Sequence, residues 1–204
     1  MKIFLKQKNK GRQILSLSKG FTLVETLVAI SIFTTSILAL LVILSGSISN
    51  TGYAKKKIIA SYLAQEGIEY IRNMRDTFVL YGATSQAGWN AFNTKVAGPS
   101  GNTVCASADG CYFGDLNAGD FTNPSQPMAG IAVTACVGAC PELKYDITTG
   151  KYNYTTGASS GYIRKIIVSP ISVYETKISS TVYWTQGSGN YNMVFSENLF
   201  NWVE

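Results

Sequence analysis

The sequence predicts an α+β protein, in which a long N-terminal helix packs on a C-terminal antiparallel β-sheet of three to four strands. Three observations support this fold class. The chain has an almost uncharged apolar block near its start, a helical repeat of apolar residues after it, and runs rich in β-branched and aromatic residues towards its end. Its 204 residues leave room for one ordinary domain and an appendage.

Residues 1–20 form a basic leader. The chain has 17 Lys and Arg residues, of which six lie in this leader together with no acid, so residues 21–204 keep 11 basic residues against 12 acidic ones. The overall net charge of +5 is therefore a property of the leader and does not describe the folded part. Because the folded part has no basic excess, the charge implies no nucleic-acid partner.

Residues 21–44 predict a transmembrane helix. They read FTLVETLVAISIFTTSILALLVIL, with Glu25 as the only charged residue, and about 20 apolar residues in a helix are enough to cross a bilayer. A buried helix of a soluble protein is the alternative. The basic leader favours a cytoplasmic N-terminus with the larger C-terminal part exported, and the lysines at 55–57 weaken this orientation without reversing it.

Glu25 needs an explanation, because a charge inside hydrocarbon costs about 2.5–3.5 kcal/mol on insertion scales. A functional role requires a positively charged partner, and the alternative is a side chain that reaches the headgroups near the helix end. A secretory signal peptide would be cleaved after the apolar run, at a small-x-small pattern. Here the break in composition, Lys19-Gly20, lies before the run.

The segment Gly20-Phe21-Thr22-Leu23-Val24-Glu25, between a basic leader and an apolar helix, resembles the type IV pilin family, which includes the type II secretion pseudopilins. The resemblance covers about residues 12–44. It implies that a prepilin peptidase cuts between Gly20 and Phe21 on the cytoplasmic side of the membrane and methylates the new amino group. It also implies that Glu25 neutralises the N-terminus of a neighbouring subunit during assembly.

The physical chemistry of this segment agrees with that expectation. Cleavage would place a positive charge at Phe21 in the same low-dielectric layer that holds Glu25, where opposite charges attract more strongly than in water. Pairing within one helix is possible. Pairing between staggered helices would relieve two buried charges at once when subunits assemble.

Residues 45–80 predict an amphipathic continuation of the helix that packs on the sheet. The apolar residues recur at helical spacing, and two charged pairs, Glu69–Arg72 and Arg72–Asp76, are spaced to support a helix. Gly46 and Gly52 are the places where the helix would bend or melt. The apolar repeat consists of Ile59, Leu63, Tyr70, Met74 and Phe78.

Residues 81–144 predict an irregular loop region, with a short helix around Ala87 to Asn93. The region contains all four cysteines, and an even number of cysteines on the exported side favours disulfides. Of the three possible pairings we prefer the local one, because each pair then brackets a Gly-containing turn. The alternative is a four-thiolate zinc site, which the x5 spacing of one pair fits poorly. The preferred pairs are Cys105–Cys111 and Cys136–Cys140.

Residues 145–204 predict an antiparallel sheet and a C-terminal cover. Thr149-Gly150 divides the first of four strand-like runs into a hairpin, Pro170 marks an edge or a break, and Ser196–Glu204 fold back over the sheet. One buried face is expected from Ile178, Ser180, Val182 and Trp184. The four runs are Tyr145–Tyr154, Tyr162–Ile171, Val173–Trp184 and Tyr191–Phe195.

The composition argues against an enzyme. The chain has no histidine, so a Ser-His-Asp triad, a Cys-His couple and a His-containing zinc site are excluded. The segment 157–161 fits G-x-S-x-G, but we expect it to be a turn between strands. Asp109, Asp115 and Asp120 do not have the spacing of a calcium loop. No cofactor and no metal are expected.

The sequence as a whole predicts a structural subunit, a minor pilin, which is processed after Gly20 and assembled through its N-terminal hydrophobic helix. The expected partners are prepilin peptidase, other pilin subunits and the membrane. We expect a single-pass membrane protein before assembly and an extracellular filament afterwards. The alternatives are a minor pseudopilin of a type II secretion system and a membrane-anchored receptor or adhesin that does not polymerise.

Overall fold

The computed structural model describes residues 20, 22–101, 103–114 and 133–201. The chain divides into two compact units, residues 1–49 and residues 50–204. The first helix, α1 (Leu23–Tyr81), contributes to both units, and its helical assignment passes through Gly46 and Gly52 without a break. Neither glycine therefore ends the helix.

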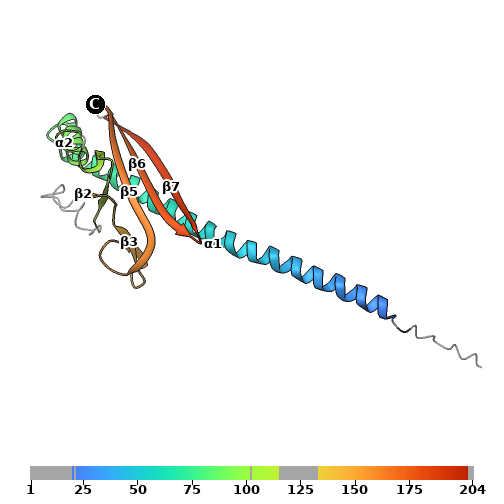
Figure 1. Cartoon of the computed structure of the whole chain (residues 1–204). Coiled ribbons are helices and arrows are strands. Elements are labelled where there is room, and N and C mark those ends of the chain that lie inside the picture. Colours follow the sequence, from blue (N-terminus) through green and yellow to red (C-terminus); the bar gives the residue numbers. More distant parts are fainter. Residues whose placement is uncertain (1–19, 21, 102, 115–132, 202–204) are drawn as a thin grey trace, which may run out of the picture. The chain divides into compact units, whose positions relative to one another are not determined.

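In the second unit, α1 packs on a C-terminal antiparallel sheet, which confirms the α+β class (Figure 1). Its buried residues follow the helical repeat expected for residues 45–80: Leu63, Tyr70, Met74 and Phe78 are buried and Ile59 is partly buried. These buried residues form one apolar stripe along the helix, and this stripe faces the sheet.

The sheet has seven strands among the described residues, more than the three to four expected. The three long C-terminal strands form a meander in which β5 pairs with β6 and β6 with β7. On its other side β5 pairs with β3 and, at Ile166, with β1. The strands are β1 (Cys111–Phe113), β2 (Val133–Ala135), β3 (Glu142–Asp146), β4 (Lys151–Asn153), β5 (Ala158–Ser172), β6 (Glu175–Gln186) and β7 (Gly189–Phe200).

The region 81–144 is more regular than its composition indicates. It contains α2 (Ser85–Ala97), the 3-10 helix η1 (Val104–Ala106), β1, β2 and the start of β3. Helix α2 is longer than the expected helix at both ends: Thr84 caps its start, accepting the N–H of Ala87 on Oγ1 at 3.1 Å, and Gly98 caps its end, donating its N–H to the carbonyl of Thr94. Strands β1 and β2 have three residues each, which is too short for alternation to be recognised in the sequence.

The first strand-like run is a hairpin, as Thr149-Gly150 predicted. It is divided between β3 and β4, and the N–H of Gly150 donates to the carbonyl of Asp146 at 2.8 Å. The expected C-terminal cover is wrong for residues 196–200, which continue β7 instead. They do so because β6 extends far enough to pair with them, for example Thr176 with Leu199. Residues 202–204 lie outside the described residues.

Pro170 lies where the ladder between β5 and β6 becomes irregular. It pairs with Thr176, and the register shifts between Pro170 and Ser172. Within the described residues, no strand pairs with this end of β5 on the side away from β6. The position therefore fits a residue that cannot donate a ladder hydrogen bond.

The inner face of β6 is the buried face expected from its alternation, since Ile178, Ser180 and Val182 are fully buried and Trp184 is 3% exposed. Two apolar clusters lie between α1 and the sheet. One gathers α2 residues such as Trp89 and Phe92 with the later part of α1, and the other surrounds Leu63 and Leu143. Trp89 also donates its indole N–H to the carbonyl of Val173 at 2.8 Å, which fixes α2 to the β5–β6 turn.

Candidate functional site

The start of α1 is organised by a helix cap. The backbone N–H of Glu25 donates to Oγ1 of Thr22 at 3.2 Å, so Thr22 is the N-cap and Glu25 the third helical residue. This is the T-x-x-E arrangement of a capping box, in which the acid also lies near the positive end of the helix dipole. Glu25 therefore has a local role in starting the helix. The T-x-x-E spacing is visible in the sequence, but we did not predict this cap from it. Gly20 is exposed, and Phe21 lies outside the described residues.

The hydroxyl groups in the apolar segment are satisfied within the helix. Each donates to a backbone carbonyl three or four residues earlier, at 2.7–3.0 Å. Such back-bonding allows polar side chains to lie in an apolar environment without a partner from outside. The residues are Thr26, Ser31, Thr34, Thr35 and Ser36.

The apolar side chains of the same segment are exposed among the residues that the structure describes. The large ones from Leu23 to Leu44 are 41–80% exposed. The most apolar stretch of α1 has a mean hydropathy of 2.7 and is 0% buried, so by length and composition the helix could cross a membrane. A continuous apolar surface of this kind requires lipid or other protein to cover it.

The four cysteines form the two local disulfides that were preferred from their spacing, Cys105–Cys111 and Cys136–Cys140. The two loops that they close contact each other. The N–H of Cys136 donates to the carbonyl of Gly110 at 2.9 Å, and the N–H of Gly138 donates to the carboxylate of Asp109 at 3.1 Å. The carboxylate of Asp109 therefore orders a backbone loop. Asp115 and Asp120 lie outside the described residues.

The G-x-S-x-G segment is not the turn that we expected, because residues 158–161 begin β5. Its serines bond to the neighbouring strand β3, with the hydroxyl of Ser159 donating to Glu142 and that of Ser160 to the carbonyl of Leu143. These bonds lower the pKa of Glu142, first through the Ser159 hydroxyl and then through the N–H of Gly161. The serines thus hold two strands together.

One of the two expected charged pairs on α1 is confirmed. Arg72 binds Glu69 at 2.7 Å, but its other nitrogen binds Glu197 of β7 at 2.5 Å instead of Asp76. Asp76 is bound by Arg75. The hydrogen bond that Arg72 donates to the carboxylate of Glu197 is the largest cause of the raised pKa of Arg72. Helix spacing alone predicts that Arg72 pairs with Asp76, but in the folded protein Glu197 of the sheet takes the place of Asp76 as the partner of Arg72.

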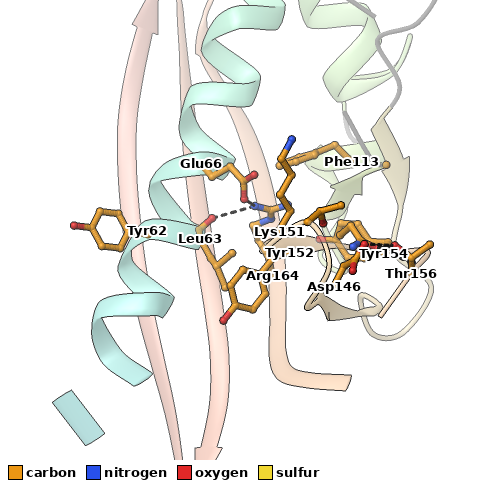
Figure 2. A pocket seen from close by; sticks show the side chains of 13 residues that line it. Tyr62, Leu63, Glu66, Phe113, Asp146, Lys151, Tyr152, Tyr154, Thr156 and Arg164 are labelled. Atoms are coloured by element: carbon orange, nitrogen blue, oxygen red, sulfur yellow. Dashed lines mark hydrogen bonds and ion pairs between the residues drawn. The ribbon is translucent and has the colours of Figure 1, made fainter. Parts of the chain in front are cut away.

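Sequence reasoning missed Arg164, a buried cation that is 2% exposed. Its Nη1 donates to the carbonyl of Leu63 at 3.2 Å and to Glu66 at 2.5 Å (Figure 2). Its Cζ lies 3.9 Å from the ring centroid of Phe113, which stacks on Tyr70 at 3.9 Å between centroids. The signal was the alternation of β5, which places residue 164 on the same face as Tyr162 and Ile166.

Comparison with known proteins agrees with the geometry of the N-terminal segment. Residues 15–45 match the family described as the prokaryotic N-terminal methylation motif. No curated protein matches the chain, and no solved structure does. The motif points to a structural protein family and not to an enzyme, and with the apolar helix it fits a membrane-anchored precursor. The match over residues 15–45 supports the assignment of this chain to the type IV pilin-like prepilins.

Proposed function

We propose that this protein is a minor structural subunit of a type IV pilus-like filament, cleaved after Gly20 and assembled through its N-terminal hydrophobic helix. The observation that carries the proposal is the methylation motif on a capped helix whose apolar side chains are left exposed by the described part of the chain. Before assembly, lipid covers this surface. After assembly, the corresponding helices of other subunits replace the lipid, and the filament lies outside the cell.

Glu25 provides the register in this mechanism. Its carboxylate lies in the first turn of the apolar segment, where an uncompensated charge costs about 2.5–3.5 kcal/mol on insertion scales. The amino group created at Phe21 supplies a positive charge of the same kind. Pairing the two between neighbouring subunits removes both costs together, so assembly is favoured over the isolated subunit in the membrane. Methylation of the amino group preserves its charge.

The mature N-terminus tests cleavage. The intact mass of protein taken from the membrane or from filaments should lack residues 1–20 and carry one additional methyl group. A full-length mass would contradict the proposal and would favour the alternative of a membrane-anchored receptor or adhesin. The other alternative, a minor pseudopilin of a type II secretion system, predicts the same mass. The two alternatives differ in the assembly motor that incorporation requires: a pilus motor for a minor pilin, and a type II secretion motor for a pseudopilin.

The helix cap allows the charge of Glu25 to be tested separately from its local role. Glutamine can take the same place as glutamate in a capping box, so Glu25→Gln removes the charge and retains the cap. Thr22→Ala removes the Oγ1 acceptor and retains the charge. We expect Glu25→Gln to abolish incorporation while membrane insertion persists, and Thr22→Ala to incorporate. Normal incorporation of Glu25→Gln would show that charge pairing is not the assembly mechanism.

A further inference from the structure

Three consecutive lysines, Lys55, Lys56 and Lys57, lie on α1 where the second unit begins. Lys55 and Lys57 are exposed, and Lys56 donates a hydrogen bond from its ammonium group to the carbonyl of Thr185 at 2.8 Å. None of the three takes part in an ion pair among the described residues. This part of the helix therefore carries positive charge that the described chain does not neutralise.

Acidic residues are scarce around the three lysines. The chain has none between Glu25 and Glu66, and residues 178–196, which include most of β6 and β7, have no charged residue. On the neighbouring strand β3, Glu142 is already bound by the hydroxyl of Ser159. The exposed lysines are therefore available to an anionic partner from outside the chain.

The β6–β7 turn and two tyrosines lie beside the same part of α1. A Cβ at Gly52 would lie 3.1 Å from Nε2 of Gln186, so the turn contacts the helix there. The rings of Tyr53 and Tyr191 lie 5.0 Å apart between centroids, and Tyr191 is 38% exposed. Tyrosine is enriched where lipid meets water, because its ring is apolar and its hydroxyl group is polar. Lysine and tyrosine together are typical of a surface that meets lipid headgroups.

The three lysines point in different directions around the helix. Consecutive residues of an α-helix are separated by about 100°, so residues 55–57 span about 200° of its circumference. A neighbouring helix would contact one face, where charges recur three or four positions apart. A flat surface that crosses the helix would contact several sides of it at one level. The arrangement therefore favours a lipid surface over a second helix as the partner.

The lysines lie close enough to the apolar segment for their charges to reach its membrane. Leu44 ends that segment, and the helix from Leu44 to Lys55 is about 16 Å long, a distance that any bend would shorten. The headgroup layer accounts for about 5–7 Å of it, and a Debye length at physiological ionic strength is about 8 Å. Side chains of a helix also lean towards its N-terminus, which here is the direction of the apolar segment.

We propose that Lys55 and Lys57 bind the phosphates of anionic phospholipids in the leaflet on the exported side. The ammonium group of lysine binds phosphate as a compact charge, and each lysine near an anionic surface adds to the attraction. These contacts hold the start of the second unit at the membrane before assembly, and they break when the subunit enters the filament. The inference rests on the proposed insertion of the precursor in a membrane, and it names the lipid that this precursor selects.

The experiment measures how fast each lysine of the full chain reacts with an acetylating reagent, read residue by residue by mass spectrometry. The chain is reconstituted in nanodiscs of phosphatidylcholine alone, or of phosphatidylcholine with about one third phosphatidylglycerol. We expect the labelling of Lys55 and Lys57 to be slower by about threefold or more in the anionic discs. Most of this difference should disappear at about 0.5 M salt, where the Debye length is about 4 Å. Lys151 and Lys177, which are exposed on β4 and β6, should change by less than about twofold.

A pair of double variants tests the same contact by lipid selection. Lys55→Gln with Lys57→Gln removes two charges from the proposed contact, and Lys151→Gln with Lys177→Gln removes the same charge from other exposed positions. Native mass spectrometry of protein released from the mixed discs counts the lipids that stay bound. We expect the first double variant to retain about threefold less phosphatidylglycerol, relative to phosphatidylcholine, than the unmodified protein. The control should retain as much as the unmodified protein, and the basic leader is common to all three chains.

Equal labelling of Lys55 and Lys57 in the two kinds of disc would refute the contact with anionic lipid. Equal slowing at Lys151 and Lys177 would also refute it, since overall charge would then explain the result. Slowing that appears in neutral discs after other pilin subunits are added would identify a protein partner instead. If the double variant unfolds, the labelling of the unmodified chain decides. A chain that does not insert in the discs would contradict the proposed function as well, whereas the first three results leave that function standing.

Discussion

Replacing Gly88 with alanine should destabilise the second unit, although alanine is the better helix former. Gly88 lies in α2 where that helix meets the end of α1. A Cβ at this position would lie 2.7 Å from Cα of Val79 and closer still to the carbonyl oxygen of Phe78. Both atoms belong to the backbone, so neither can rotate away.

The size of the effect follows from two opposing terms. Alanine in place of glycine favours a helix by about 1 kcal/mol. Carbon atoms in contact prefer a separation of about 3.5–4.0 Å, so α2 must move away from α1 by about 1 Å. Overpacking of this kind costs about 1–3 kcal/mol, and the movement also loosens Trp89 and Phe92, which are 1% and 0% exposed. We expect a net loss of about 1–2 kcal/mol, or about 2–8 °C in Tm.

The measurement is thermal or urea unfolding of the full chain in detergent, followed by tryptophan fluorescence. Gly114→Ala is the control, because a Cβ at Gly114 would meet no heavy atom within 4 Å. We expect Gly114→Ala to be neutral or slightly stabilising, since it restricts the unfolded chain. If Gly88→Ala were as stable as the unmodified protein, the close approach of α2 to α1 would not be a rigid feature of the fold.

Three further predictions concern the cap, the loops and the carboxylates of the second unit. Thr84→Ala removes the acceptor that caps α2 and should lower the free energy of unfolding by about 1 kcal/mol, whereas Thr84→Ser should retain most of it in the same urea titration. Replacing Cys136 and Cys140 together with serine opens a short loop and should cost about 2 kcal/mol; an unchanged urea midpoint would show that the loop holds without the bond. The pKa of Glu142 is lowered in the folded state, so its carboxylate stabilises the fold above about pH 4.5, and this stabilisation is lost as the pH falls through the folded-state pKa. Glu142→Gln should therefore reduce the loss of unfolding free energy at acidic pH, measured by urea titrations over a range of pH values. An unchanged loss at acidic pH would contradict this role.

The parts of this protein that the sequence predicted correctly are encoded locally. The charge of the leader, the apolar block and Gly20 to Glu25 lie next to one another in the chain, so composition and order alone indicate the membrane helix and the prepilin resemblance. The period of α1 and the turn at Thr149-Gly150 are also local signals, and both are confirmed. Apolar periodicity and turn-forming residues act over a few neighbouring positions, so they can be recognised without knowing which distant residues the segment contacts.

The tertiary structure decided what depends on distant partners. Strand β1 is three residues long and exists because Cys111 pairs with Ala135 and with Ile166. Arg164 is a surface-type residue by composition, yet Glu66 neutralises it across 98 positions of sequence. Strand pairing and charge burial are properties of three-dimensional neighbours, and a single sequence does not record which residues those neighbours are.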